Sequence, residues 1–208
     1  VTLLSITLTS YYMEYSEWFY RLLGYPLRIF DTFTTEGLEF LPTNIKPEIL
    51  LCGHNRIGYS ILQGLSNVKT KVLIVDYNPE IIARLAKQGY HCLYGDITDE
   101  EVQEKMHLPE VKMVISTVPD INDNVLLIHR LRRVNRKAKI FVTAADIEES
   151  LQLYEKGADY VILPHFLGGE HASALIENIR IRKLDLDVER KKHIEHLRKR
   201  KEMKQEHP

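Results

Sequence analysis

Short apolar runs alternate with amphipathic segments along the chain from residue 48 onward. The runs lack the alternating polar positions of a half-exposed strand, so they are typical of strands covered on both faces. They lie at residues 48–52, 71–75, 91–94, 112–117, 139–143 and 160–163. Helical spacing of apolar positions occurs at residues 56–66, 79–88, 99–106, 122–135 and 147–156. Gly157 is placed to end the last of these helices, and a further helix is expected to begin near Gly169.

Six strands that alternate with helices at short spacing predict an α/β fold. Right-handed crossovers then give a Rossmann-like, doubly wound sheet of six parallel strands. We expect the strand order 3-2-1-4-5-6, with a ligand crevice at the carboxyl ends of strands 1 and 4. We expect this domain to cover residues 48–178. Residues 179–208 are expected to form a charged helical tail, and the last helix of the domain either ends before this tail or continues into it.

The N-terminal part of the chain has a different pattern. Residues 1–13 are apolar and uncharged, but a membrane span needs about 20 apolar residues. We interpret them as the end of a span from a longer chain, with Tyr11 and Tyr12 at the interface; a buried or dimer-covered helix is the alternative. No basic segment precedes them, so they are not a signal peptide. Residues 14–30 predict an amphipathic, membrane-proximal helix, and residues 31–47 predict a linker.

Composition narrows the class of protein. With 44% hydrophobic and 27% charged residues, the chain is globular rather than disordered. Its formal net charge of −1 gives no signal for nucleic acid, so we expect no such partner. Residues 180–208 are locally basic, with eleven Lys and Arg against six Asp and Glu. A solvated helix is favoured there, and a dimer-stabilising helix or a membrane-surface strip are the alternatives.

Neither the cysteines nor the histidines form a metal-binding motif. Cys52 and Cys92 fall within predicted strands, where we interpret them as small buried residues in a reducing compartment. The nine histidines show no ligand spacing. We therefore expect no metal site.

The segment after the first predicted strand carries the strongest chemical signal. The residues in the position of a dinucleotide phosphate loop are Gly53, His54, Asn55, Arg56, Ile57 and Gly58. Gly53 permits a tight turn, Gly58 permits close approach of helix and strand, and helix N-terminal amides face a phosphate. Asn55 replaces the expected middle glycine; we expect it to tolerate positive φ and to donate a hydrogen bond. With Asn55 at this position, the ligand is expected either to bind in a different position from a usual dinucleotide or to be a mononucleotide. Arg56 is placed to neutralise phosphate, with a solvated surface arginine as the alternative.

Three further candidates follow the ends of other predicted strands. Asp76 lies 18 residues after Gly58, where a carboxylate accepts both ribose hydroxyls and favours NAD over NADP. A helix cap or a turn is the alternative for Asp76. Asp96, after the third strand, lies where adenine edges are met, and Thr117, after the fourth, lies beside the phosphate crevice.

The sequence shows no evident catalytic residues. No tyrosine is followed by lysine four residues later, and no Ser-His-Asp or paired-carboxylate arrangement stands out. The residues after the sixth strand are too few for a substrate domain. We therefore expect a sensor rather than an enzyme. The rivals are a small NAD-dependent oxidoreductase and a structural dimerisation module with a vestigial nucleotide site.

Several stretches taken together resemble a known family. ILLCGHNRIGYSIL, VLIVDYNPE, YGDITD, VISTVPD and GADYVILPHFLGGEHAS look like a TrkA-N/RCK domain, the cytoplasmic regulator of potassium channels and transporters. The resemblance covers residues 47–178, and LPHFLGG is most similar to the version attached to Kef-like monovalent cation:proton antiporters.

This resemblance implies a function and a set of site roles. It implies an NAD(H), AMP, ADP or ATP ligand, a homodimer, and a transmembrane antiporter domain in the same chain, at the cytoplasmic face of the cell membrane. It assigns Gly53, Asn55, Arg56 and Gly58 to the phosphate loop, Asp76 to the ribose, Asp96 to the adenine side and Thr117 to the fourth-strand loop. The family's second, C-terminal ligand lobe has no counterpart in the short charged tail.

Overall fold

The computed structural model describes residues 46–202 together with Thr9, Tyr11 and Tyr15. Apart from these three residues, the expected end of a membrane span and the amphipathic helix lie outside the described residues, as does nearly all of the linker. Within the described residues, no helix is both long and apolar enough to cross a membrane.

Six parallel strands form one sheet, as expected. The strands are β1 (Ile49–Cys52), β2 (Val72–Asp76), β3 (His91–Tyr94), β4 (Met113–Ser116), β5 (Lys139–Thr143) and β6 (Tyr160–Ile162). Their order is β3-β2-β1-β4-β5-β6, which confirms the predicted doubly wound order. In the centre, Leu50 pairs with Leu73 of β2 and Val114 of β4, so the most apolar strands are flanked on both sides.

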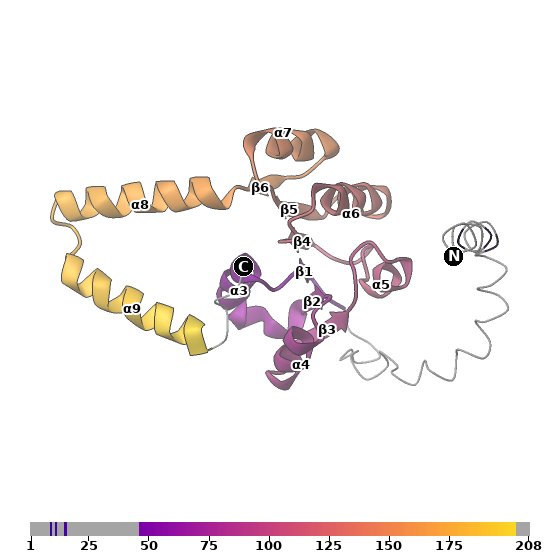
Figure 1. Cartoon of the computed structure of the whole chain (residues 1–208), viewed down its shortest axis with the longest axis horizontal. Helices are drawn as coiled ribbons and strands as arrows, with labels where there is room; N and C mark the ends of the chain where they lie inside the picture. Colours follow the sequence, from indigo (N-terminus) through magenta and orange to yellow (C-terminus); the bar gives the residue numbers. More distant parts are fainter. Residues whose placement is uncertain (1–8, 10, 12–14, 16–45, 203–208) are drawn as a thin grey trace, which may run out of the picture. The chain divides into compact units, whose positions relative to one another are not determined.

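Helices cover the two faces of this sheet (Figure 1). They are α3 (Arg56–Gly64), α4 (Pro79–Lys87), α5 (Glu100–Lys105), α6 (Ile121–Val134) and α7 (Ile147–Lys156). One apolar core lies under α3 and α4 and includes Leu62 and Ile82; the other lies under α5, α6 and α7 and includes Leu127 and Leu153. The predicted helices are confirmed, except that the first ends at Gly64 and is followed by a 3-10 segment, Ser66–Lys71.

The C-terminal helices differ from the expectation. The last predicted helix begins at Pro164 rather than near Gly169, and α8 runs Pro164–Arg180. Proline at the first helical turn costs nothing, because its missing N–H would have no partner there. A second helix, α9 (Leu186–Glu202), is separate, since Arg182 has a φ of 57° and the Asp185 carboxylate caps the new N-terminus.

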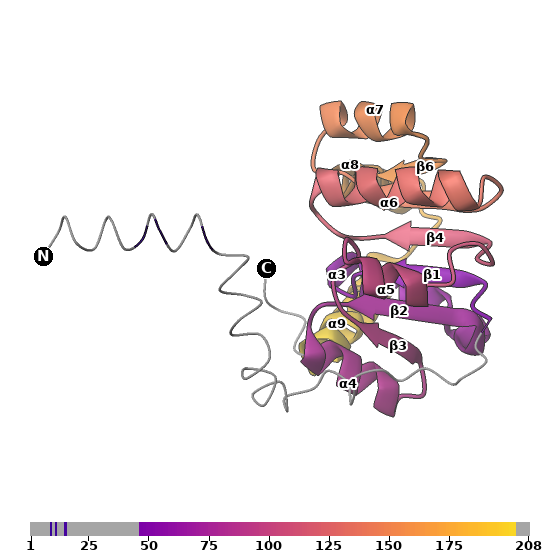
Figure 2. The same ribbon diagram turned by 90° about the vertical axis from the view of Figure 1, so that its right-hand side faces the viewer.

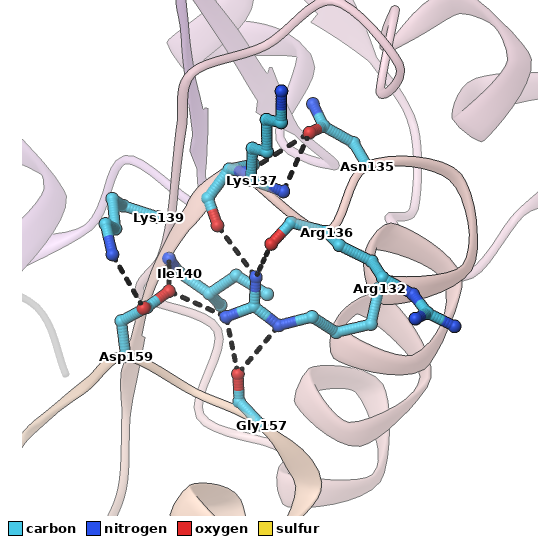
Figure 3. Close-up of polar contacts among 9 residues, drawn as sticks. Arg132, Asn135, Arg136, Lys137, Lys139, Ile140, Gly157 and Asp159 are labelled. Carbon is cyan, nitrogen blue, oxygen red and sulfur yellow. Dashed lines mark hydrogen bonds and ion pairs between the residues drawn. The ribbon is translucent and has the colours of Figure 1, made fainter.

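The amino-terminal edge of the sheet is held by an arginine network (Figure 3). From α6, the Arg132 guanidinium donates to the carbonyl oxygens of Gly157 and Ala138 at 2.7 and 2.8 Å. It also donates to the Asp159 carboxylate at 2.7 Å, and Lys139 pairs with the same carboxylate at 3.3 Å. These contacts join the ends of α6 and α7 to the starts of β5 and β6, opposite the candidate site.

Candidate functional site

The loops after β1, β2 and β4 meet at the carboxyl edge of the sheet. The Thr117 N–H donates to the Cys52 carbonyl at 2.8 Å, and the Thr117 hydroxyl donates to the Gly53 carbonyl at 3.0 Å. The Gly53 N–H donates to the Val75 carbonyl at 2.8 Å. These bonds place the candidate phosphate loop between the ends of β2 and β4, at the predicted crevice.

Two glycines give the loop its shape. Gly53 has a φ of +82°, a conformation that side chains with a Cβ rarely adopt. A Cβ on Gly58 would lie only 2.3 Å from the Gly53 carbonyl oxygen, so only glycine allows α3 to approach β1 this closely. The structure thus shows the tight turn and the close approach expected of these residues. Their contact with a ligand stays a prediction.

The N-terminus of α3 differs from those of the other helices that connect the strands. Side chains cap α4, α5, α6 and α7, and these caps are Asn78, Asp99, Asp120 and Asp146. The N-cap of α3 is Asn55, whose side chain makes no capping hydrogen bond. The first turn of α3 therefore has no side-chain cap, and the helix dipole at such an N-terminus favours an anion.

Asn55 does not need the conformation that we expected of it. Its φ is −87° and its ψ is −154°, an extended backbone that most residues adopt, so tolerance of positive φ explains nothing here. Its side chain is exposed, as is that of Arg56, and Ile57 is half-buried. Both exposed side chains lie at the start of α3, so both remain candidates for phosphate contact.

Asp76 joins the phosphate loop to the turn after β2. Its Oδ2 accepts from the His54 N–H at 2.7 Å, and its Oδ1 accepts from the Asn78 N–H at 2.8 Å. Burial raises the pKa of this carboxyl, although both N–H groups oppose the shift. The turn alternative for Asp76 is therefore correct as a structural role. It does not exclude ribose binding, because each carboxylate oxygen has a second lone pair.

His54 contributes its main chain rather than its side chain. The imidazole is only 3% exposed and packs edge-on against the Tyr59 ring, with the two centroids 6.0 Å apart. Burial and the Arg84 charge lower the pKa of His54 to about 4, so the ring is neutral at physiological pH. The main chain of His54 thus lies in the phosphate loop with its N–H bonded to Asp76, whereas its side chain belongs to the interior. Its contact with a ligand stays a prediction.

The remaining two candidates occupy different settings. Thr117 is buried and its hydroxyl is bonded to the phosphate loop, so it shapes the loop. Asp96 is exposed, and its Oδ1 accepts from the N–H and the hydroxyl of Thr98 at 2.8 and 2.7 Å. Burial raises the pKa of Asp123, and the charges of Asp120 and Asp96 raise it further. Asp96, Asp120 and Asp123 therefore form an acidic rim at this edge of the sheet, and the contact of Asp96 with adenine stays a prediction. No cluster within the described part of the chain could hold a metal ion.

Asn124 supports the site and was missed by the sequence analysis. Its side-chain amide donates to the Val118 carbonyl at 2.9 Å and to the Thr143 carbonyl at 3.4 Å, which ties the loop after β4 to the end of β5. The available signal was a polar residue on an apolar helix face. Asn124 occupies the same face as Leu127, Ile128 and Leu131, and all four are fully buried.

This chain is similar in sequence to known proteins. The TrkA-N domain family model matches residues 49–164. A probable potassium channel protein 2 from Methanocaldococcus jannaschii is 28% identical over 128 residues, which are 60% of this chain and 37% of that protein. The glutathione-regulated potassium-efflux system protein KefC of Escherichia coli O139:H28 is 23% identical over 55% of this chain and 18% of its own length. The chain thus spans less than two fifths of these relatives.

Solved structures agree in fold. The TrkA-N domain of the inner membrane protein ybaL from Escherichia coli has a TM-score of 0.57 and 21% identity, covering 65% of this chain and 98% of that one. The GsuK channel bound to NAD has a TM-score of 0.52 and 20% identity, over 70% and 27%. The AMP-bound Kef C-terminal domain of Shewanella denitrificans has a TM-score of 0.52 and 17% identity, over 73% and 91%. Since the family model matches more than half of this 208-residue chain, the chain belongs to the TrkA-N domain family.

Proposed function

We propose that this chain is the regulatory, adenine-nucleotide-binding part of a protein that transports potassium or another monovalent cation. The observation that carries the proposal is the uncapped N-terminus of α3 beside a buried carboxylate, Asp76, that is fixed by two backbone N–H groups. Helix amides suit a phosphate and a fixed carboxylate suits a ribose. The relatives named as potassium channel and potassium-efflux proteins support the transport context.

The ligand in this proposal is NAD(H), AMP, ADP or ATP. Neighbours of the same fold are bound to NAD and to AMP, so one fold accommodates both a dinucleotide and a mononucleotide. The negative charge of Asp76 opposes a 2′-phosphate, so NADP is a poor ligand. Gly53, Asn55, Arg56 and Gly58 would surround the phosphates, and Asp96 would lie on the adenine side.

The proposal includes a homodimer and an attached membrane domain. α8 has no buried residue over its 17 positions within the described chain, and Phe166 and Ile176 on it are 54% and 66% exposed. A second copy would cover this apolar surface, since most helical stability comes from tertiary packing. Residues 1–30 would end a Kef-like antiporter domain at the cytoplasmic face, and residues 31–47 would connect it to the nucleotide domain, residues 48–178.

Regulation in this scheme is a change in population. A nucleotide can shift the equilibrium between two arrangements of the dimer only by as much as its affinities for the two arrangements differ. The linker would pass that shift to the membrane domain, and cation transport would in turn change nucleotide affinity by the same factor. No catalytic step is required, and the only proposed chemistry is reversible binding.

The direct test is a selectivity titration of the purified chain with NAD⁺, NADP⁺ and AMP, followed by an assay of NADH oxidation with small carbonyl compounds. We expect binding of NAD⁺ or AMP, weaker binding of NADP⁺, and no turnover. Steady hydride transfer would identify an oxidoreductase instead. A dimer that forms without nucleotide and binds none would identify a structural module.

A further inference from the structure

The C-terminal end of α9 contacts the helix that begins at the phosphate loop. The Arg200 guanidinium lies 5.4 Å from the centroid of the Tyr59 ring, and its Nη2 donates to the Ser60 hydroxyl. α9 lies on the face of the sheet away from α5 and α6 (Figure 2). The charged tail, favoured as a simple solvated helix, therefore has a defined contact 140 residues away in the chain.

This contact attaches a helix whose apolar side chains are largely exposed. Leu186, Val188, Ile194 and Leu197 of α9 are all between 38% and 60% exposed. Tyr59, by contrast, is only 6% exposed. A cation–π pair and one hydrogen bond are modest interactions. Binding of a small ligand can strengthen or release interactions of this strength.

Tyr59 also contacts the phosphate loop. Its ring meets the His54 imidazole edge-on at 82°, and its N–H donates to the Asn55 carbonyl at 2.8 Å. The His54 N–H in turn holds Asp76. A continuous set of contacts thus leads from the ribose carboxylate through His54 and Tyr59 to Arg200.

Ser60 provides a second connection to the start of α3. Its hydroxyl donates to the Arg56 carbonyl at 3.2 Å while it receives the Arg200 hydrogen bond. Arg200 thus restrains two consecutive residues of α3, Tyr59 and Ser60. Tyr59 contacts His54 and Asn55 of the phosphate loop, and Ser60 contacts Arg56. It also brings a positive charge to the helix whose N-terminal amides are uncapped, which favours an anionic ligand.

We propose that Tyr59 and Arg200 are positioning residues for the nucleotide site, and that they couple it to α9. This rests on the proposed nucleotide binding and adds the element that responds to it. With α9 attached, the loop is restrained in the geometry that brings the α3 amides and Asp76 together, so the nucleotide binds more tightly. By thermodynamic reciprocity, the bound nucleotide holds α9 more firmly on α3.

The test combines two measurements on the full chain. Dissociation constants for AMP and NAD⁺ are measured by calorimetry for the wild type, Arg200→Ala, Tyr59→Leu, Tyr59→Phe and Arg190→Ala, after thermal melts show that each is folded. Hydrogen exchange of residues 186–202 is then followed with and without saturating nucleotide. Arg190→Ala removes the same charge from the same helix, and Tyr59→Phe keeps the ring.

We expect Arg200→Ala and Tyr59→Leu to weaken binding about three- to tenfold, and the other two variants to stay within about twofold of wild type. Nucleotide should slow exchange in α9 of the wild type but not of Arg200→Ala. Equal dissociation constants for Arg200→Ala and Arg190→Ala, or α9 exchange that ignores nucleotide, would overturn the coupling alone. A wild type that binds neither nucleotide would overturn both the coupling and the proposed function.

Discussion

The main-chain N–H of His54 donates a 2.7 Å hydrogen bond to Oδ2 of Asp76, 22 residues further along the chain. This bond joins the candidate phosphate loop to the candidate ribose carboxylate before any ligand is bound. Both residues are buried, with exposures of 3% and 6%, so the bond is protected from competing water. The bond holds the candidate phosphate loop and Asp76 in a fixed relation, which would lower the ordering cost of the proposed nucleotide binding.

The close approach at Gly58 predicts an intolerant position. In Gly58→Ala the new Cβ would meet the Gly53 carbonyl oxygen at 2.3 Å, and backbone cannot move aside cheaply. We expect a loss of about 1–3 kcal/mol in the free energy of unfolding, together with loss of nucleotide binding. Gly64→Ala is the control, because a Cβ there meets nothing within 4 Å. Equal stability of the two variants in urea would contradict the packing argument.

His54 predicts a specific dependence of stability on pH. Its pKa falls from 6.5 to about 4 on folding, so the folded state binds this proton less readily than the unfolded state. The stabilisation is complete above pH 6.5 and is lost as pH falls toward 4; it amounts to at most about 3 kcal/mol. Denaturant unfolding at pH 7 and 4.5 should show a smaller loss in His54→Leu than in wild type or His129→Gln. An unchanged pH dependence in His54→Leu would refute this account.

The Arg132 network predicts a loss of stability that spares the site. Arg132→Ala removes the donors to Gly157, Ala138 and Asp159, and the free energy of unfolding should fall by about 2–3 kcal/mol. Nucleotide affinity should be unchanged, since the network lies at the opposite edge of the sheet. Arg133→Ala, at an exposed neighbouring position, is the matched control. A large fall in affinity without a fall in stability would show that the network has another role.

The sheet was predictable because its signals are local. Strand ends agree within about one residue because each apolar run is bounded by polar residues or glycine. The start of α8 was not predicted correctly, because Gly168 and Gly169 resemble a helix boundary. In the structure a Cβ at either would meet open space, so the pair lies within an exposed helix that Pro164 begins.

Within the site, position along the chain was predictable and side-chain direction was not. Asp76 and the phosphate-loop glycines follow from spacing after β1. The His54 ring packs against Tyr59, five residues further along the chain, and the Arg200 contact joins residues that no local pattern relates. Tertiary packing decides such contacts, and a single sequence does not encode them as a motif.

The exposed face of α8 predicts self-association. Ile176 is 66% exposed, and Ile176→Asp would place a charge in the proposed dimer interface. We expect the mass measured by analytical ultracentrifugation to change from dimer to monomer. Val134→Asp is the control, since Val134 is 50% exposed at the end of α6. A dimer that survives Ile176→Asp would place the interface elsewhere.

The central claim is that Asp76 and the N-terminus of α3 bind an adenine nucleotide. The most direct measurement is calorimetric titration of the chain with NAD⁺, NADH, AMP, ADP and ATP, repeated with Asp76→Asn and with Asp146→Asn, which alters a helix cap at α7. We predict saturable binding of at least one nucleotide, weakened about tenfold or more in Asp76→Asn and unchanged in Asp146→Asn. Absence of binding at millimolar nucleotide, or equal affinity in wild type and Asp76→Asn, would contradict it.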